Sequence, residues 1–264
     1  MKLWRSLRSR AEPEKLTWRE RKVKSEAPKH ALRMLPLLAN PLPPPFGLVL
    51  IGVAATMPRT LLTPQFWTDG QCVAFARQDS DATRRRHAKL LVELTRTAER
   101  AREVGPGGAT LAAADPGAVL GSVADAFGEG SGLAIGALPR RHLVRLARTA
   151  RPRPPSRFFL RFSRKKTIRA ALVAAAQAAA AEDEALDADL ARDGDAALSA
   201  RELLEVCAAR GIRVDGGHAA RLRRVRFWLQ ARRGLLAAAG DAKPPSLLLH
   251  LPALLSALLE QTHD

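Results

Sequence analysis

A run of cations mixed with aromatic side chains is the part of this sequence best suited to chemistry, and that chemistry is the binding of an anion. Residues 139–170 contain 12 Lys or Arg and no Asp or Glu, together with Phe158, Phe159 and Phe162. Cations bind phosphates and aromatic rings stack on unpaired bases, so this mixture is typical of surfaces that bind single-stranded nucleic acid. The alternative is a solvated basic face over a core that contains the phenylalanines. We favour binding for the arginines and burial for the phenylalanines.

Two groups of cations are the candidate binding residues. The chain carries a formal net charge of +17, which indicates an anionic partner such as RNA, an acidic lipid surface or a ribosome. The first group lies in the basic run: Arg157, Arg161, Arg164, Lys165, Lys166 and Arg169. The second group lies on a helix expected over residues 217–233: Arg221, Arg223, Arg224 and Arg226. The first group ranks higher because its run contains no acidic residue.

The sequence contains no pattern typical of an enzyme or of a metal site. It has no P-loop, nucleophile elbow or H-E-x-x-H motif. The histidines that could act lack partners at metal-ligand or catalytic-triad spacing: His87, His142, His218 and His250. The acidic residues at 182–195 fail as a calcium loop, because Gly194 at loop position 6 would leave Ala200 at position 12, where a bidentate Glu is needed. We therefore expect no enzymatic activity, no cofactor and no metal. Cys72 and Cys207 match no metal spacing and are expected to be buried, reduced thiols.

The elements expected to position these residues are helices. Ala, Leu and Arg dominate the chain, while β-branched and aromatic residues are few, which favours helix over sheet. A capping box formed by Thr68 and Gln71 predicts a helix that starts near Asp69, and a second, longer helix is expected over 82–104. Further helices are expected near 118–127, over 170–185, from the Ser199 and Glu202 capping box to a C-cap at Gly211, over 217–233, and from 245 with a kink or break at Pro252.

An uncharged stretch at 34–58 is the other distinctive part of the sequence. Its length would suffice for a membrane helix, but its prolines leave a longest proline-free piece of 12 residues. That piece covers about 18 Å of helix, against a hydrocarbon core of about 30 Å. A broken single span, a re-entrant hairpin or interfacial segment, and a buried core helix remain open. The basic arm at 1–33 is either a targeting helix or a juxtamembrane arm, and the Gly-rich stretch at 105–136 is insertion-like.

Five motifs, in order along the chain, resemble the LETM family of mitochondrial inner-membrane proteins (leucine-zipper, EF-hand transmembrane proteins). They are P-R-T-L-L-T-P-Q-F-W-T at 58–68, F-L-R-F at 159–162, L-S-A-R-E-L-L-E-V-C-A-A-R-G-I-R at 198–213, R-L-R-R-V-R-F-W-L-Q at 221–230 and P-S-L-L-L-H-L-P-A-L-L at 245–255. The F-W-T element at 66–68 and the L-L-L-H sequence at 247–250 resemble the LETM-domain-containing subgroup more than the full-length exchanger type, whose EF-hand and long coiled coil are not found in this sequence.

The resemblance implies a specific fold and location. It implies an all-α, irregular helical bundle, 14-3-3-like, at 59–264, which faces the mitochondrial matrix and follows a hydrophobic membrane anchor at 34–58. It also implies binding to the mitochondrial ribosome, through rRNA or ribosomal proteins, and contact with inner-membrane lipids. The family is further linked to potassium/proton or calcium/proton exchange. That alternative would require a homo-oligomer here, because a single short span with almost no polar groups cannot form an ion path alone.

Overall fold

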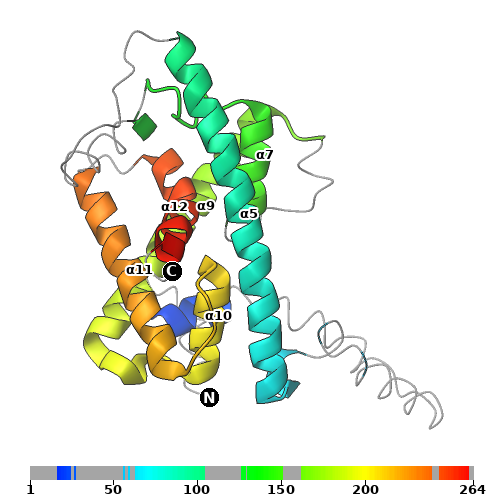
Figure 1. The fold of residues 1–264 in the computed structure, drawn as a ribbon, viewed down its shortest axis with the longest axis vertical. Helices are drawn as coiled ribbons and strands as arrows, with labels where there is room; N and C mark the ends of the chain where they lie inside the picture. Colours follow the sequence, from blue (N-terminus) through cyan, green and yellow to red (C-terminus); the bar gives the residue numbers. More distant parts are fainter. Residues whose placement is uncertain are drawn as a thin grey trace. The chain divides into compact units, whose positions relative to one another are not determined.

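Every regular element in the described part of the chain is a helix, which confirms the predicted all-α class. The computed structural model describes residues 17–24, 27, 56, 59, 63–104, 126–128, 130–150, 162–239 and 244–261. The elements in Figure 1 are η2 (Pro64–Phe66), α5 (Asp69–Val104), α7 (Arg140–Thr149), α9 (Lys165–Asp193), η3 (Gly194–Ala197), α10 (Ala200–Arg210), α11 (His218–Ala238) and α12 (Pro245–Gln261).

The expected anchor at 34–58 lies outside the described residues except for Thr56. Among the helices that are described, none combines the length and the apolar character needed to cross a bilayer. The arm at 1–16 and most of the Gly-rich stretch also lie outside the described residues.

The chain divides into two compact units, and the first is built from residues 1–75 and 184–201. Its described part contains a short helical stretch at 18–24, which begins with a capping box: the backbone N–H of Thr17 donates to Glu20 at 3.0 Å, and that of Glu20 donates to the Thr17 hydroxyl at 3.3 Å. Trp18 is buried, and its backbone N–H donates to the Asp189 carboxylate at 3.0 Å. This box has the T-x-x-E sequence signature at Thr17 and Glu20, and it starts a helical stretch that was not predicted.

The start of α5 confirms the prediction made from Thr68 and Gln71. The backbone N–H of Thr68 donates to the Gln71 side chain at 3.0 Å, and that of Gln71 donates to the Thr68 hydroxyl at 3.3 Å. The prediction of two helices in this region is wrong, because α5 runs unbroken from Asp69 to Val104. Polar side chains near the expected break are satisfied without ending the helix: Thr83 donates to the Asp79 carbonyl at 2.7 Å and Ser80 to that of Ile212 at 2.8 Å.

Two other helices, α9 and α11, exceed their predicted bounds. Helix α9 covers Lys165–Asp193 rather than 170–185, and α11 extends to Ala238. Helix α12 continues through Pro252, where a break was one of the two expectations. A proline inside a helix removes one backbone hydrogen bond, but Leu251, Ala253 and Leu255 around it are almost fully buried. Packing of these side chains therefore supports the helix across the proline.

The end of α10 is a Schellman motif at Gly211, as the sequence predicts. Gly211 has φ +70°, the Ile212 N–H donates to the Cys207 carbonyl at 2.9 Å, and the Gly211 N–H donates to that of Ala208 at 3.5 Å. A Cβ at this position would also lie 3.2 Å from both the His87 ring and the Ser256 hydroxyl. The left-handed backbone conformation therefore favours glycine here, and a Cβ would also crowd side chains of α5 and α12.

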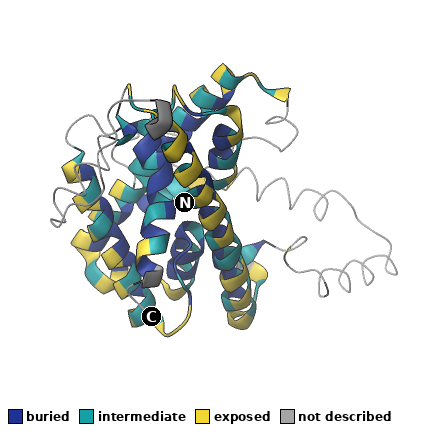
Figure 2. Cartoon of the chain, turned by 45° about the horizontal axis from the view of Figure 1, so that its top comes forward, coloured by how far each residue is buried: buried dark blue, intermediate teal, exposed yellow. Residues whose placement is uncertain are grey.

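The second unit, residues 76–183 and 202–264, holds the larger core. Figure 2 shows buried residues on the faces that its helices turn toward one another and exposed residues on the outer faces. Trp228 on α11 is 1 % exposed, which confirms it as a core anchor. Cys207 in this unit and Cys72 in the first unit are both buried thiols without a disulfide, also as predicted. Burial raises the pKa of the Cys207 thiol to about 12.

Candidate nucleic-acid interface

Helix α7 separates its apolar and basic residues onto two faces. Its buried side chains are His142, Leu143, Leu146 and Ala147. Its arginines fall between these positions, so that three of them share one side of the helix at i, i+4 and i+7: Arg141, Arg145 and Arg148. Burial of one face therefore fixes which way the cations of the other face point.

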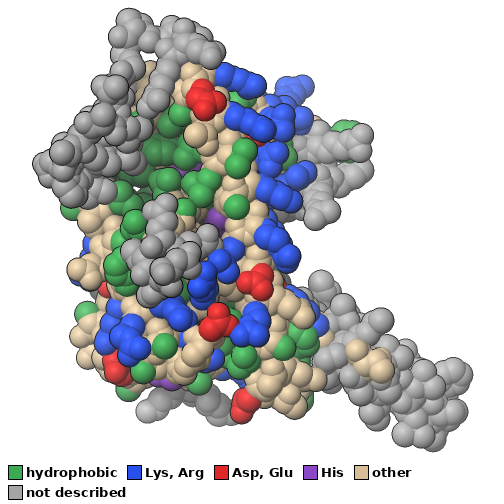
Figure 3. Space-filling model, viewed as in Figure 1, with side chains coloured by type: hydrophobic (Ala, Val, Ile, Leu, Met, Phe, Trp, Pro, Cys, Tyr) green, Lys and Arg blue, Asp and Glu red, His purple; other side chains and the backbone are tan. Residues whose placement is uncertain are grey.

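A groove lies between the basic side of α7 and helix α5. It has a volume of about 650 Å³, and every charged side chain that lines it is a cation; we call this the α7 groove, lined by Lys89, Arg140, Arg141, Val144, Arg145 and Arg148. Figure 3 shows Lys and Arg side chains gathered along the edge of the molecule where α5 and α7 run. A concave surface lined by cations concentrates positive potential and attracts anions.

Glu93 of α5 holds two of these arginines in place. Its carboxylate is almost fully buried, with 4 % of the side chain exposed, and its Oε2 lies 3.1 Å from Arg145 Nε and 3.4 Å from Arg141 Nε. The exposed fraction of the Arg141 side chain is still 66 %. The buried Glu93 carboxylate therefore pairs with both guanidinium groups from the interior of the domain and leaves Arg141 open to solvent.

The start of α9 continues this basic surface. The Arg140 guanidinium donates to the Ser163 carbonyl at 3.2 Å, and Arg169 of α9 donates to the carbonyl of Gly136, just before α7. These two contacts tie the first turns of α7 and α9 together. We therefore define the basic face as the cations of the α7 groove and of the start of α9: Lys89, Arg140, Arg141, Arg145, Arg148, Arg164, Lys165, Lys166 and Arg169.

The structure places part of the first predicted group on this face. Arg164, Lys165, Lys166 and Arg169 lie at or near the start of α9, partly or fully exposed, whereas Arg157 and Arg161 lie outside the described residues. Phe158 and Phe159 lie outside them as well. Phe162 is 67 % exposed, so the expectation of a core position is wrong for this ring.

The second predicted group is divided between two roles. Arg221 donates to the Val214 carbonyl at 2.7 Å, and Arg224 donates to the carbonyls of Arg213 at 3.1 Å and Asp215 at 2.6 Å. These guanidinium groups hold the loop between α10 and α11. The remaining two, Arg223 and Arg226, are exposed on α11.

Sequence reasoning missed the α7 groove, although its arginines lie within the run at 139–170. The available signal was the i, i+4, i+7 spacing of Arg141, Arg145 and Arg148 against buried-type residues between them. Neither Lys89 nor Glu93 carried such a signal, because α5 meets α7 only in the folded domain.

A buried chain of hydrogen bonds joins α7 to α5 and α12. Thr97 Oγ1 lies 2.9 Å from His142 Nδ1, His142 Nε2 lies 2.7 Å from His250 Nε2, and His250 Nδ1 lies 2.7 Å from the Ser246 carbonyl. Because a carbonyl only accepts, His250 carries its hydrogen on Nδ1, and His142 donates from Nε2 to His250 Nε2. His142 Nδ1 is then an acceptor, so the single hydroxyl hydrogen of Thr97 is shared between His142 Nδ1 and the Glu93 carbonyl, which lies 2.8 Å from Thr97 Oγ1. Burial lowers the pKa of His142 to about 4 and of His250 to about 3. Both rings are therefore neutral at physiological pH.

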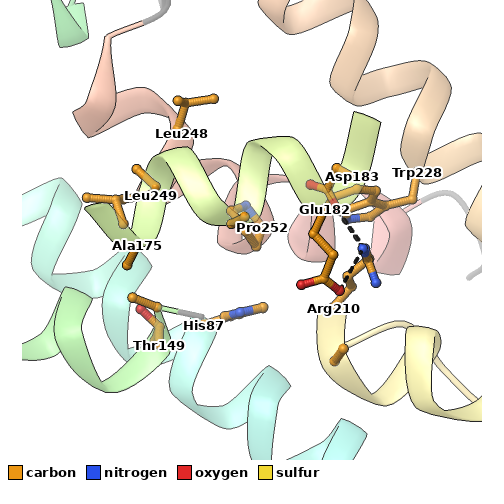
Figure 4. A pocket seen from close by; sticks show the side chains of 14 residues that line it. His87, Thr149, Ala175, Glu182, Asp183, Arg210, Trp228, Leu248, Leu249 and Pro252 are labelled. Carbon is orange, nitrogen blue, oxygen red and sulfur yellow. Dashed lines mark hydrogen bonds and ion pairs between the residues drawn. The ribbon is translucent and has the colours of Figure 1, made fainter. Parts of the chain in front are cut away.

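An interior pocket of the second unit is built around a buried ion pair (Figure 4). Arg210 lies 2.5 Å from Asp183 and 3.7 Å from Glu182, while Arg232 lies 3.1 Å from Asp183. The Arg210 guanidinium also lies 5.3 Å from the centre of the Trp228 ring. The cavity beside them is about 50 Å³. That volume admits water but is far below the roughly 300–1,000 Å³ of small-molecule sites. Nor do three or more His, Cys, Asp or Glu gather as a metal site anywhere in the described residues.

The comparison with known families decides what kind of domain carries this surface. The family described as LETM1-like, RBD, the ribosome-binding domain, matches residues 16–254. The chain belongs to the LETM1-like ribosome-binding domain family. No curated protein and no solved structure matches it significantly.

Within this LETM1-like domain, the motif that carried the resemblance is mainly structural. The signature at 198–213 contributes buried residues of α10 and its cap: Leu198, Leu203, Cys207, Arg210 and Gly211. These residues pack, pair or turn the chain, and none of them lines the α7 groove. The motif that identifies the LETM1-like family therefore lies in the core of the domain, and it does not identify the residues that bind a partner at the surface.

Proposed function

We propose that this LETM1-like domain docks on the mitochondrial ribosome through its basic face. The observation that carries the proposal is the α7 groove, in which five cations from α5 and α7 surround one concavity. Ribosomes present dense negative charge, and binding by surface cations releases counterions from it. The family description, a ribosome-binding domain, supports the same partner. We further propose an inner-membrane location with this domain in the matrix, following the LETM resemblance.

Reversing charges at the rim of the groove tests the proposal. The variant Lys89→Glu/Arg140→Glu/Arg148→Glu leaves Arg141 and Arg145 on Glu93, so the buried carboxylate keeps its partners. We expect this variant to lose co-sedimentation with purified mitochondrial ribosomes at about 150 mM salt, and the wild type to lose it only as salt is raised.

The matched control carries the same charge change on another helix. Arg223→Glu/Arg226→Glu/Arg233→Glu alters three exposed arginines of α11 and should keep wild-type binding. Loss of binding in the α11 variant with retention in the groove variant would move the site to the second predicted group. Retention in both would contradict docking through either cation cluster. Circular dichroism and thermal melting of each variant report whether the fold is intact.

The exchange alternative stays a prediction of the resemblance. The hydrophobic segment on which it depends lies outside the described residues. Cation flux in liposomes that contain only the purified chain would support it.

A further inference from the structure

We propose that the α7 groove holds the phosphate backbone of a single RNA strand and that Phe162 stacks on one of its unpaired bases. The inference rests on the proposed function, since exposed ribosomal RNA would supply the strand. It assigns the partner to RNA rather than to an acidic ribosomal protein.

The spacing of the groove cations suits a row of phosphates. At about 1.5 Å rise per residue, Arg141, Arg145 and Arg148 are separated by about 6 and 4.5 Å along the axis of α7. The row therefore extends over about 10 Å, enough to face the phosphates of a short stretch of one strand. Lys89 lines the groove from α5. A backbone lying in the groove would meet cations from both helices.

The two helix starts beside the groove add to its positive potential. The N-cap position of α7 is Pro139, whose side chain cannot accept a hydrogen bond from the first turn. Neither α7 nor α9 has an acidic residue in its first turn. Cations occupy these turns instead, including Arg140 and Lys165. Cations oppose the dipole at a helix N-terminus and destabilise it, whereas a bound anion interacts favourably with both. This arrangement favours an anionic ligand over an empty surface.

Phe162 is the feature that selects RNA with unpaired bases. Its side chain is 67 % exposed, and the carbonyl of the next residue, Ser163, accepts a hydrogen bond from Arg140 at the groove. An exposed aromatic ring next to a residue that is bonded to a groove cation matches the combination used to bind single strands, in which phosphates meet cations and bases stack on rings. The bases of a duplex are already stacked on one another. An acidic protein surface would engage the cations alone.

Fluorescence anisotropy with a labelled RNA of about ten nucleotides, single-stranded or paired with its complement, tests the inference. We expect the wild type to bind the single strand more tightly. Phe162→Ala should weaken single-strand binding by about tenfold without changing the duplex affinity. Phe162→Trp should keep the single-strand affinity of the wild type, because it keeps an aromatic ring at this position. The control Phe227→Ala removes an exposed ring of α11 and should have no effect. The Lys89→Glu/Arg140→Glu/Arg148→Glu variant should reduce the slope of log affinity against log salt by about 2.

Two results would overturn the inference. One is equal affinity for single strand and duplex together with no effect of Phe162→Ala. The other is the absence of RNA binding by a wild-type protein that still co-sediments with ribosomes, which would assign the groove to an acidic ribosomal protein and leave the proposed function intact. RNA binding by a protein that does not bind ribosomes would instead refute the proposed function and leave the RNA site standing.

Discussion

Replacing Asp183 with asparagine is expected to lower the free energy of unfolding by about 3–5 kcal/mol. Asp183 lies between Arg210 and Arg232, at 2.5 and 3.1 Å, and these guanidinium groups are only 7 % and 5 % exposed. Burial raises the pKa of the Asp183 carboxyl, and the two cations oppose that shift. Two buried guanidinium groups at ion-pair distance are matched by the charged form of this carboxylate. Without its charge, two buried cations face each other and the half-exposed Glu182 at 3.7 Å is their nearest compensation.

Urea unfolding followed by far-ultraviolet circular dichroism measures this loss. The control is Glu99→Gln, an exposed carboxylate on α5, which should change the free energy of unfolding by no more than about 0.5 kcal/mol. The variant Asp183→Leu/Arg210→Met/Arg232→Met removes all three charges and should be more stable than Asp183→Asn, because burying an unpaired charge costs more than losing the pair. If the Asp183→Asn variant were as stable as the wild type, the charge of Asp183 would not be needed to compensate the buried charges of Arg210 and Arg232, and the expectation would be wrong.

Acidification from about pH 7 to about pH 5 is expected to remove about 4 kcal/mol from the free energy of unfolding through the histidine pair alone. The pKa of His142 is lowered to about 4 and that of His250 to about 3, while an unfolded histidine titrates near 6.5. Between these values the unfolded chain binds more protons than the folded domain, so stability falls as the pH falls. Each ring contributes about 2 kcal/mol at pH 5, and the two losses add.

The pH dependence of urea unfolding checks this second expectation. His142→Leu/His250→Leu replaces both rings with apolar side chains and should flatten the dependence between about pH 7 and pH 5. Leu143→Ala, a fully buried neighbour on α7, should lower stability at every pH and keep the wild-type slope. A double leucine variant that keeps the full acid sensitivity would assign it to other groups.

Local sequence determined the helix ends and the class of fold. The Thr68 and Gln71 capping box and the Gly211 cap are formed as predicted, because both motifs pair backbone groups with residues a few positions away. Composition fixed the all-helical class for the same reason, since helix propensity is a local property. The family resemblance also came from the sequence, and the match over 16–254 confirms it.

Helix lengths were predicted less well, and α5 shows why. Ser80 and Thr83 are poor residues for a helix interior when considered alone. In the fold, Ser80 bonds the carbonyl of Ile212, which lies far along the chain, and the helix continues through both residues. Burial of the surrounding face against the rest of the domain outweighs local propensity, and no local pattern reports it.

The sequence alone thus determined that this is a basic, all-α, LETM1-like domain with an excess of cations in one run. Only the tertiary structure decided which cations share a surface and which hold the fold: Glu93 meets Arg141 and Arg145 across about fifty residues, and His142 meets His250 across more than a hundred. Sequence spacing identifies partners only within one helix. It therefore could not predict the contact between His142 and His250, or the α7 groove, because each joins residues of different helices. Packing of α5, α7 and α12 brings these groups together, because burying the apolar faces of the helices fixes where their polar residues meet.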